Sequence, residues 1–64
     1  MLDLRAVHSA VKREDWPTAW HLSSIALNED PDRPEALYLA GCCLRAMGNI
    51  GLSLVCFSRA LSKE

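Results

Sequence analysis

The sequence predicts an all-α fold of two antiparallel helix hairpins, and three observations support this prediction. Apolar residues recur at three- and four-residue spacing in four segments, as is typical of amphipathic helices. No segment alternates between apolar and polar residues as a strand would, and β-branched residues are few. Glycine, proline and helix-capping residues separate the four segments. With 64 residues, the chain is expected to form one domain over residues 1–64.

Each expected helix carries one apolar stripe that would face the core. Connections of about two to four residues would make each pair of helices an antiparallel hairpin. The expected helices are Met1 to about Arg13, Trp16–Leu27, Pro34–Met47 and Ile50–Leu61. Their stripes are Leu2, Ala6, Val7 and Ala10; Trp16, Ala19, Trp20, Ser23, Ala26 and Leu27; Leu37, Ala40, Gly41 and Leu44; and Ile50, Leu54, Phe57 and Leu61.

The breaks between the segments have the chemistry of helix ends. Asp15 precedes the second segment and can accept hydrogen bonds from the free N–H groups of a first turn. Gly48 is suited to ending the third segment, and Asn49 to capping the fourth. Asp32 and Glu35 have the spacing of a capping box at the start of the third segment.

The second hairpin repeats the first with an offset of 34 residues. Ala6 and Ala40 are identical at this offset, and so are Leu27 and Leu61. With this period the chain resembles the tetratricopeptide repeat family. The second copy carries the family pattern as Leu37, Ala40-Gly41, Leu44, Ser53, Phe57 and Ala60, and the first copy carries it less completely as Asp3, Ala6-Val7, Ala10, Ala19, Ser23, Ala26 and Pro31.

The resemblance implies that the hairpins stack as a short right-handed α-solenoid, with repeat one over about residues 1–33 and repeat two over about residues 34–64. It also places Gly41 where the two helices of one hairpin cross most closely. A glycine inside a helix costs about 1 kcal/mol relative to alanine. We expect packing to offset this cost, because a side chain at Gly41 would push the helices apart.

A concave groove is the binding surface that the resemblance implies. In this family the open faces of the first helix of each hairpin take an extended peptide or a partner helix. These faces carry three basic residues and one acidic residue, which favours a peptide of acidic character. The equal alternative is that these faces are only exposed to solvent and bind no partner. The Lys and Asn side chains with which some family members grip a carboxylate are absent, since Leu4, His8 and Leu39 stand there. The expected groove residues are Leu4, Arg5, His8, Lys12, Glu35, Tyr38, Cys42 and Arg45.

The fourth segment also offers a surface for self-association. Leu52, Val55 and Cys56 lie off its apolar stripe and would be exposed at the end of the stack. The chain is therefore either a fragment of a longer array or a unit that forms a homodimer or oligomer through this uncapped helix. A third possibility is the docking arm of a larger enzyme.

Side chains that could carry chemistry are scattered along the sequence. The cysteines, Cys42, Cys43 and Cys56, suit a metal or redox site poorly, because adjacent cysteines on a helix point about 100° apart. Cys43 and Cys56 are expected to be small apolar fillers, with Cys42 on the open face. Their odd number favours reduced thiols. His8 and His21 have no partner at catalytic or metal-ligand spacing. The sequence thus predicts no enzyme, no cofactor and no metal.

Other classes of function fit less well. Trp16 and Trp20 lie one turn apart and could form a binding platform, but core packing is favoured, with Trp20 the more exposed. The segment Arg45–Leu61 could be misread as a DNA-binding helix-turn-helix, but the second helix of that motif has only Arg59 as a charged side chain before its end. The net charge of −1 also shows no basic excess. No apolar run approaches the roughly 18 residues of a membrane span, and no signal peptide is evident. We therefore expect a cytoplasmic, non-catalytic module that binds a protein or peptide, without nucleic acid or membrane.

Overall fold

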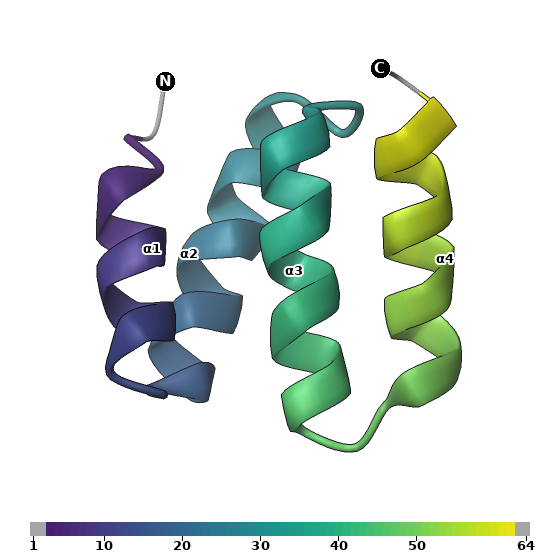
Figure 1. Cartoon of the computed structure of the whole chain (residues 1–64). Coiled ribbons are helices and arrows are strands. Elements are labelled where there is room, and N and C mark those ends of the chain that lie inside the picture. The colour runs from purple at the N-terminus through teal and green to yellow at the C-terminus, as the bar shows by residue number, and fades with distance from the viewer. Residues whose placement is uncertain (1–2, 63–64) are drawn as a thin grey trace.

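The structure, a computed structural model, describes residues 3–62, which form four α-helices and no strand. Successive helices run in opposite directions (Figure 1), and each packs against the next, while α1 also contacts α3. The predicted all-α class is confirmed. None of the helices in this part of the chain is long and apolar enough to cross a membrane. The helices are α1 (Arg5–Lys12), α2 (Trp16–Glu29), α3 (Pro34–Ala46) and α4 (Ile50–Ser62).

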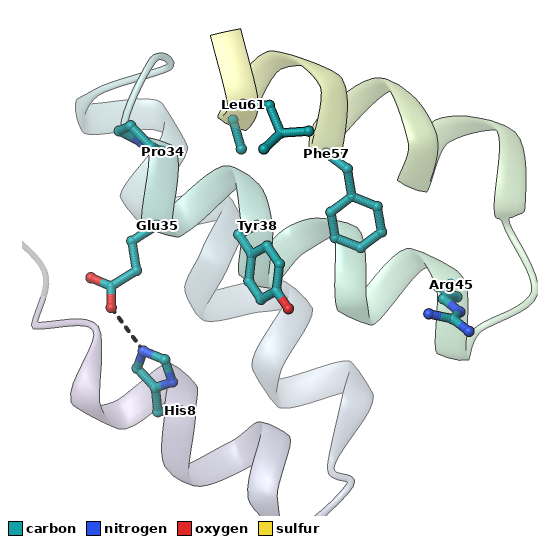
Figure 2. A pocket seen from close by; sticks show the side chains of 8 residues that line it. His8, Pro34, Glu35, Tyr38, Arg45, Phe57 and Leu61 are labelled. Carbon is teal, nitrogen blue, oxygen red and sulfur yellow. Dashed lines mark hydrogen bonds and ion pairs between the residues drawn. The ribbon is translucent and has the colours of Figure 1, made fainter. Parts of the chain in front are cut away.

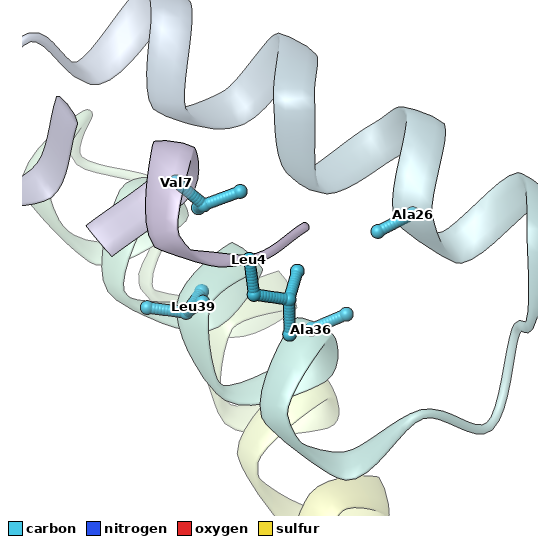
Figure 3. Packing of buried hydrophobic residues seen from close by; sticks show 5 residues of the cluster. All are labelled: Leu4, Val7, Ala26, Ala36 and Leu39. Atoms are coloured by element: carbon cyan, nitrogen blue, oxygen red, sulfur yellow. The ribbon is translucent and has the colours of Figure 1, made fainter. Parts of the chain in front are cut away.

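The central helix is α3, which contacts all three others. Its predicted stripe is buried throughout, and so are Ala36, Leu39 and Cys43 on a second face. The stripe faces α4, whereas the second face packs against α1 and α2. A helix that is apolar on two faces joins the two hairpins through one core. The cluster drawn in Figure 3 contains Leu4, Val7, Ala26, Ala36 and Leu39.

The first helix differs from its prediction. It begins at Arg5, after a turn at Leu4, while Met1 and Leu2 lie outside the described residues. Ala6, which was expected in the core, is exposed, and Leu4 is buried instead. The core face follows the three-residue spacing from Leu4 through Val7, because this face presents larger apolar side chains to α2 and α3 than Ala6 does.

The apolar stripe predicted for the fourth helix is wrong at three of its positions. Ile50, Leu54 and Leu61 are exposed, whereas Ser53 and Ala60 are the buried residues of α4. The side chain that lies over Gly41 is nevertheless a large one, Phe57 of α4. A Cβ atom on Gly41 would lie 2.6 Å from the ring atom Cε1 of Phe57, far inside van der Waals contact, so a side chain at Gly41 would displace this ring.

The predicted core packing holds for Trp16 and is wrong for Trp20, although Trp20 was expected to be the more exposed of the two. Trp16 is partly buried and packs against the cluster of Ala10, Ala19 and Cys43. Trp20 is the more exposed of the two, at 37%. Trp16 therefore serves the core rather than a paired binding platform.

The acidic side chains near the helix starts do not act as the predicted caps. The Asp15 side chain makes no capping hydrogen bond to α2, and the residue that precedes α3 is Arg33 rather than Asp32. A proline in the first turn of each of these helices removes one donor that a cap would otherwise satisfy. The Oδ1 atom of Asp32 instead lies 3.5 Å from Arg59, so it links the loop to α4.

The turns inside the two hairpins are copies of each other at the 34-residue offset. The N–H of Asp15 donates to the carbonyl of Ala10 at 2.9 Å, and the equivalent bond of the second turn, donated by Asn49, measures 2.8 Å. The residue before each donor is left-handed, with φ of 89° at Gly48 and 57° at Glu14. Glycine adopts this conformation freely, whereas a residue with a side chain is disfavoured there by roughly 1 kcal/mol.

Replacing Glu14 by glycine is therefore expected to raise the free energy of unfolding by about 1 kcal/mol, which corresponds to about 4–8 °C in melting temperature for a domain of this size. Thermal unfolding followed by circular dichroism measures the change. Arg13→Gly is the control, because Arg13 has a right-handed φ of −84° and should lose stability with glycine. A lower melting temperature for Glu14→Gly would contradict the strain at this turn.

Candidate functional site

An open pocket of about 770 Å³ lies between α3 and α4 and extends to His8 on α1 (Figure 2). We call it the α3–α4 pocket. Its walls are apolar side chains and rings, with charged groups toward its ends. The lining residues are His8, Pro34, Glu35, Tyr38, Arg45, Phe57, Ala60 and Leu61.

Half of the predicted groove residues line this pocket. His8 comes from α1, and Glu35, Tyr38 and Arg45 come from α3, where Tyr38 is one turn after Glu35 and Arg45 is two turns after Tyr38. Because residues three and four apart share a helix face, α3 presents its three side chains along one edge of the pocket. These four residues of the predicted groove therefore lie together, and whether they bind a partner stays a prediction.

The other predicted groove residues lie elsewhere. Leu4 is a core residue, only 4% exposed, so its assignment to the open face was wrong. The Nε group of Arg5 donates a hydrogen bond to Asp3 at 2.9 Å, and this contact lowers the pKa of the Asp3 carboxyl. Lys12 is exposed and Cys42 is half-buried, and neither lines the pocket. Of the three basic residues predicted for the groove, only Arg45 therefore lines the pocket.

Two aromatic rings form the centre of the pocket wall. The ring centroids of Tyr38 and Phe57 lie 5.4 Å apart with an interplanar angle of 52°. This tilted arrangement is a favourable one for aromatic pairs, worth about 0.5–1.5 kcal/mol beyond burial. It holds Phe57 between Tyr38 and the backbone of Gly41.

Sequence reasoning missed the contribution of α4 to this site. Phe57 and Leu61 were assigned to the core of the second hairpin, yet both line the pocket, together with Ala60. Their four-residue spacing was the available signal, since it places both side chains on one face of α4.

A hydrogen-bonded contact between His8 and Glu35 links the two hairpins at one end of the pocket. The Nε2 atom of His8 lies 2.9 Å from Oε2 of Glu35, and both side chains are about half exposed. An exposed pair of this kind adds at most about 1 kcal/mol to stability, so its main effect is to orient the two groups. Arg45 at the other end makes no ion pair within residues 3–62.

The thiols and histidines form no reactive cluster in the part of the chain that the structure describes. Residues 3–62 contain no group of three His, Cys, Asp or Glu side chains arranged to hold a metal ion. The three cysteines are free, and burial raises the pKa of the Cys42 and Cys43 thiols. A thiol with a raised pKa stays protonated at neutral pH and is a weak nucleophile. His21 is exposed on α2.

The predicted self-association face lies apart from the pocket. Leu52 and Val55 are exposed, and Cys56 is half-buried, but none of them lines the α3–α4 pocket. The surface of α4 therefore has two apolar regions, one formed by these residues and one that continues the pocket wall through Leu61.

No family model, curated protein or solved structure matches this chain. Residues 3–62 define a small all-helical protein with an apolar, ring-lined pocket that carries a histidine–carboxylate pair at one end and a guanidinium at the other.

Proposed function

We propose that this chain is a non-catalytic protein–protein interaction module of the tetratricopeptide type, with its hairpins stacked as a short right-handed α-solenoid. It binds a peptide or a partner helix in the α3–α4 pocket. The observation that carries this proposal is the exposed apolar wall, where Tyr38 and Leu61 are 57% and 68% exposed. Contiguous apolar surface of this kind is typical of a binding site, because water solvates it poorly.

The charges of the pocket favour a ligand with one acidic group. Glu35 is paired with His8, which leaves Arg45 as the cation available to a ligand. A guanidinium forms bidentate hydrogen bonds with a carboxylate. Apolar side chains of the ligand would then contact Tyr38 and Leu61, with the acidic group directed toward Arg45.

Selection from a peptide display library, followed by fluorescence anisotropy with the selected peptides, tests this proposal. Leu61→Glu is expected to weaken binding at least tenfold, because it places a charge on the apolar wall. Leu52→Glu is the matched control: Leu52 is a similarly exposed leucine of α4 outside the pocket and should leave affinity unchanged. Equal affinities for the wild type and Leu61→Glu would place the binding site elsewhere.

A second candidate function is self-association through Leu52, Val55 and Cys56, which the exposure of Leu52 and Val55 favours. Sedimentation equilibrium over a wide concentration range measures it. A dimer that Leu52→Glu dissociates, and Leu61→Glu does not, is the result expected for this candidate.

A further inference from the structure

We infer that the α3–α4 pocket is a seat for a single α-helix of another protein, and that this helix presents small apolar residues to it. This inference rests on the proposed function and specifies the form of its ligand.

The first hairpin contains an occupied surface of this kind, which we call the first seat. In it α1 and α2 form a surface against which α3 packs, with Ala36 and Leu39 in contact with the cluster of Leu4, Val7 and Ala26 (Figure 3). The occupant of this first seat is thus a helix that runs antiparallel to α2 (Figure 1).

The second hairpin builds the same seat again. Because the two hairpins repeat at an offset of 34 residues, each residue of the first seat has an equivalent in the second. Tyr38, Arg45, Ala60 and Leu61 of the pocket are the equivalents of Leu4, Val11, Ala26 and Leu27, which pack in the first seat.

The two seats differ in how far they are covered. Leu4 is 4% exposed beneath α3, whereas its equivalent Tyr38 is 57% exposed. Leu27 is partly buried against the first cluster, whereas its equivalent Leu61 is 68% exposed. The side chains that α3 covers in the first seat are therefore the ones that form the open wall in the second.

The residues that α3 buries in the first seat indicate which residues a partner helix needs in the pocket. The seated face of α3 consists of Ala36, Leu39 and Cys43, at positions i, i+3 and i+7, and all three are buried. A partner helix needs small or medium apolar residues at this spacing. Where the first seat has Val11 the pocket has Arg45, so the partner helix is expected to carry an acidic residue beside its i+7 position.

A second copy of this chain does not supply such a helix through α1. At the same offset, Leu39 and Cys43 correspond to Arg5 and Ser9, which are exposed on α1. Seating α1 of a neighbour would place the Arg5 guanidinium, which is hydrogen-bonded to Asp3, among apolar side chains. Helix α1 of a second copy therefore does not fit this seat.

The test uses a panel of fluorescent synthetic peptides, each held helical by a staple on the outer face. Every peptide carries Ala, Leu and Ala at i, i+3 and i+7 and Glu at i+8, with varied outer positions. Control peptides replace a central outer residue by proline, which prevents the helix. Stapled peptides are expected to bind at least tenfold more tightly than the proline peptides, and Leu61→Glu should abolish this binding while Leu52→Glu retains it.

Charge reversal adds a readout of the orientation of the helix. Arg45→Glu should weaken the Glu peptides at least tenfold and restore binding to peptides with Lys at i+8. Circular dichroism confirms that each variant is folded.

Three outcomes would overturn the inference. Equal binding of stapled and proline peptides, with both lost in Leu61→Glu, would show an extended ligand and leave the proposed function standing. A dimer that Leu61→Glu dissociates would assign the seat to a second copy of the chain. A monomer that binds neither these peptides nor any display-selected peptide would refute both the inference and the proposed function.

Discussion

Replacing Gly41 by leucine is expected to lower the free energy of unfolding by about 3 kcal/mol, the upper range for overpacking a core. The first added atom would already lie 2.6 Å from Cε1 of Phe57. The ring of Phe57 also contacts Tyr38, at a centroid distance of 5.4 Å. Since a scaffold of this size has only about 3–5 kcal/mol of stability, the variant should keep no more than about 2 kcal/mol, and its urea midpoint should fall by more than half.

Gly51 provides the matched control for this substitution. It lies in α4, and an added Cβ would meet no atom within 4 Å. Gly51→Leu is therefore expected to keep or raise stability, because leucine has the higher helix propensity. Combining Gly41→Leu with Phe57→Ala should cost less than the sum of the two single changes, since the contact is shared. An unchanged urea midpoint for Gly41→Leu would refute the close crossing of α3 and α4.

Truncating Leu37 to alanine is the second change with a large expected effect. Leu37 is 2% exposed on the face of α3 that meets α4, and it is the largest fully buried side chain among the described residues. Truncation of a buried leucine costs about 2–5 kcal/mol, depending on how far the cavity collapses. We expect Leu37→Ala to be mostly unfolded at 25 °C by circular dichroism.

Leu54→Ala is the control, because it makes the same leucine-to-alanine substitution at an exposed site. Leu54 is 61% exposed on α4, so its truncation should change stability by no more than about 0.5 kcal/mol. Equal losses for Leu37→Ala and Leu54→Ala would show that α4 packs through the stripe predicted from periodicity rather than through Ser53 and Ala60.

These variants separate the core of the second hairpin from its binding surface. Gly41 and Leu37 report on the contact between α3 and α4, whereas Leu61 and Arg45 report on the pocket beside it. A loss of binding in a variant that keeps its melting temperature can therefore be assigned to the pocket.

The sequence by itself determined the helical segments, their turns and the stripe of α3. These features depend on local chemistry: Gly48 ends α3 because it adopts a positive φ freely, and proline starts α2 and α3 because a first turn needs no N–H there. The 34-residue offset is likewise a property of the chain alone. The expectation of a close neighbour at Gly41 also came from the sequence, because a glycine inside a helix costs about 1 kcal/mol that packing can offset.

Only the tertiary structure decided which side of α4 is buried and which residues form the pocket. Before Arg59, α4 has no charged side chain, so its periodicity does not distinguish the core face from the open one. Packing against α3 made that choice, because it buries Ser53 and Ala60 and leaves Leu61 on the pocket wall. The pairing of His8 with Glu35 also depends on how α1 and α3 lie together, a relation between distant parts of the chain that no local pattern contains.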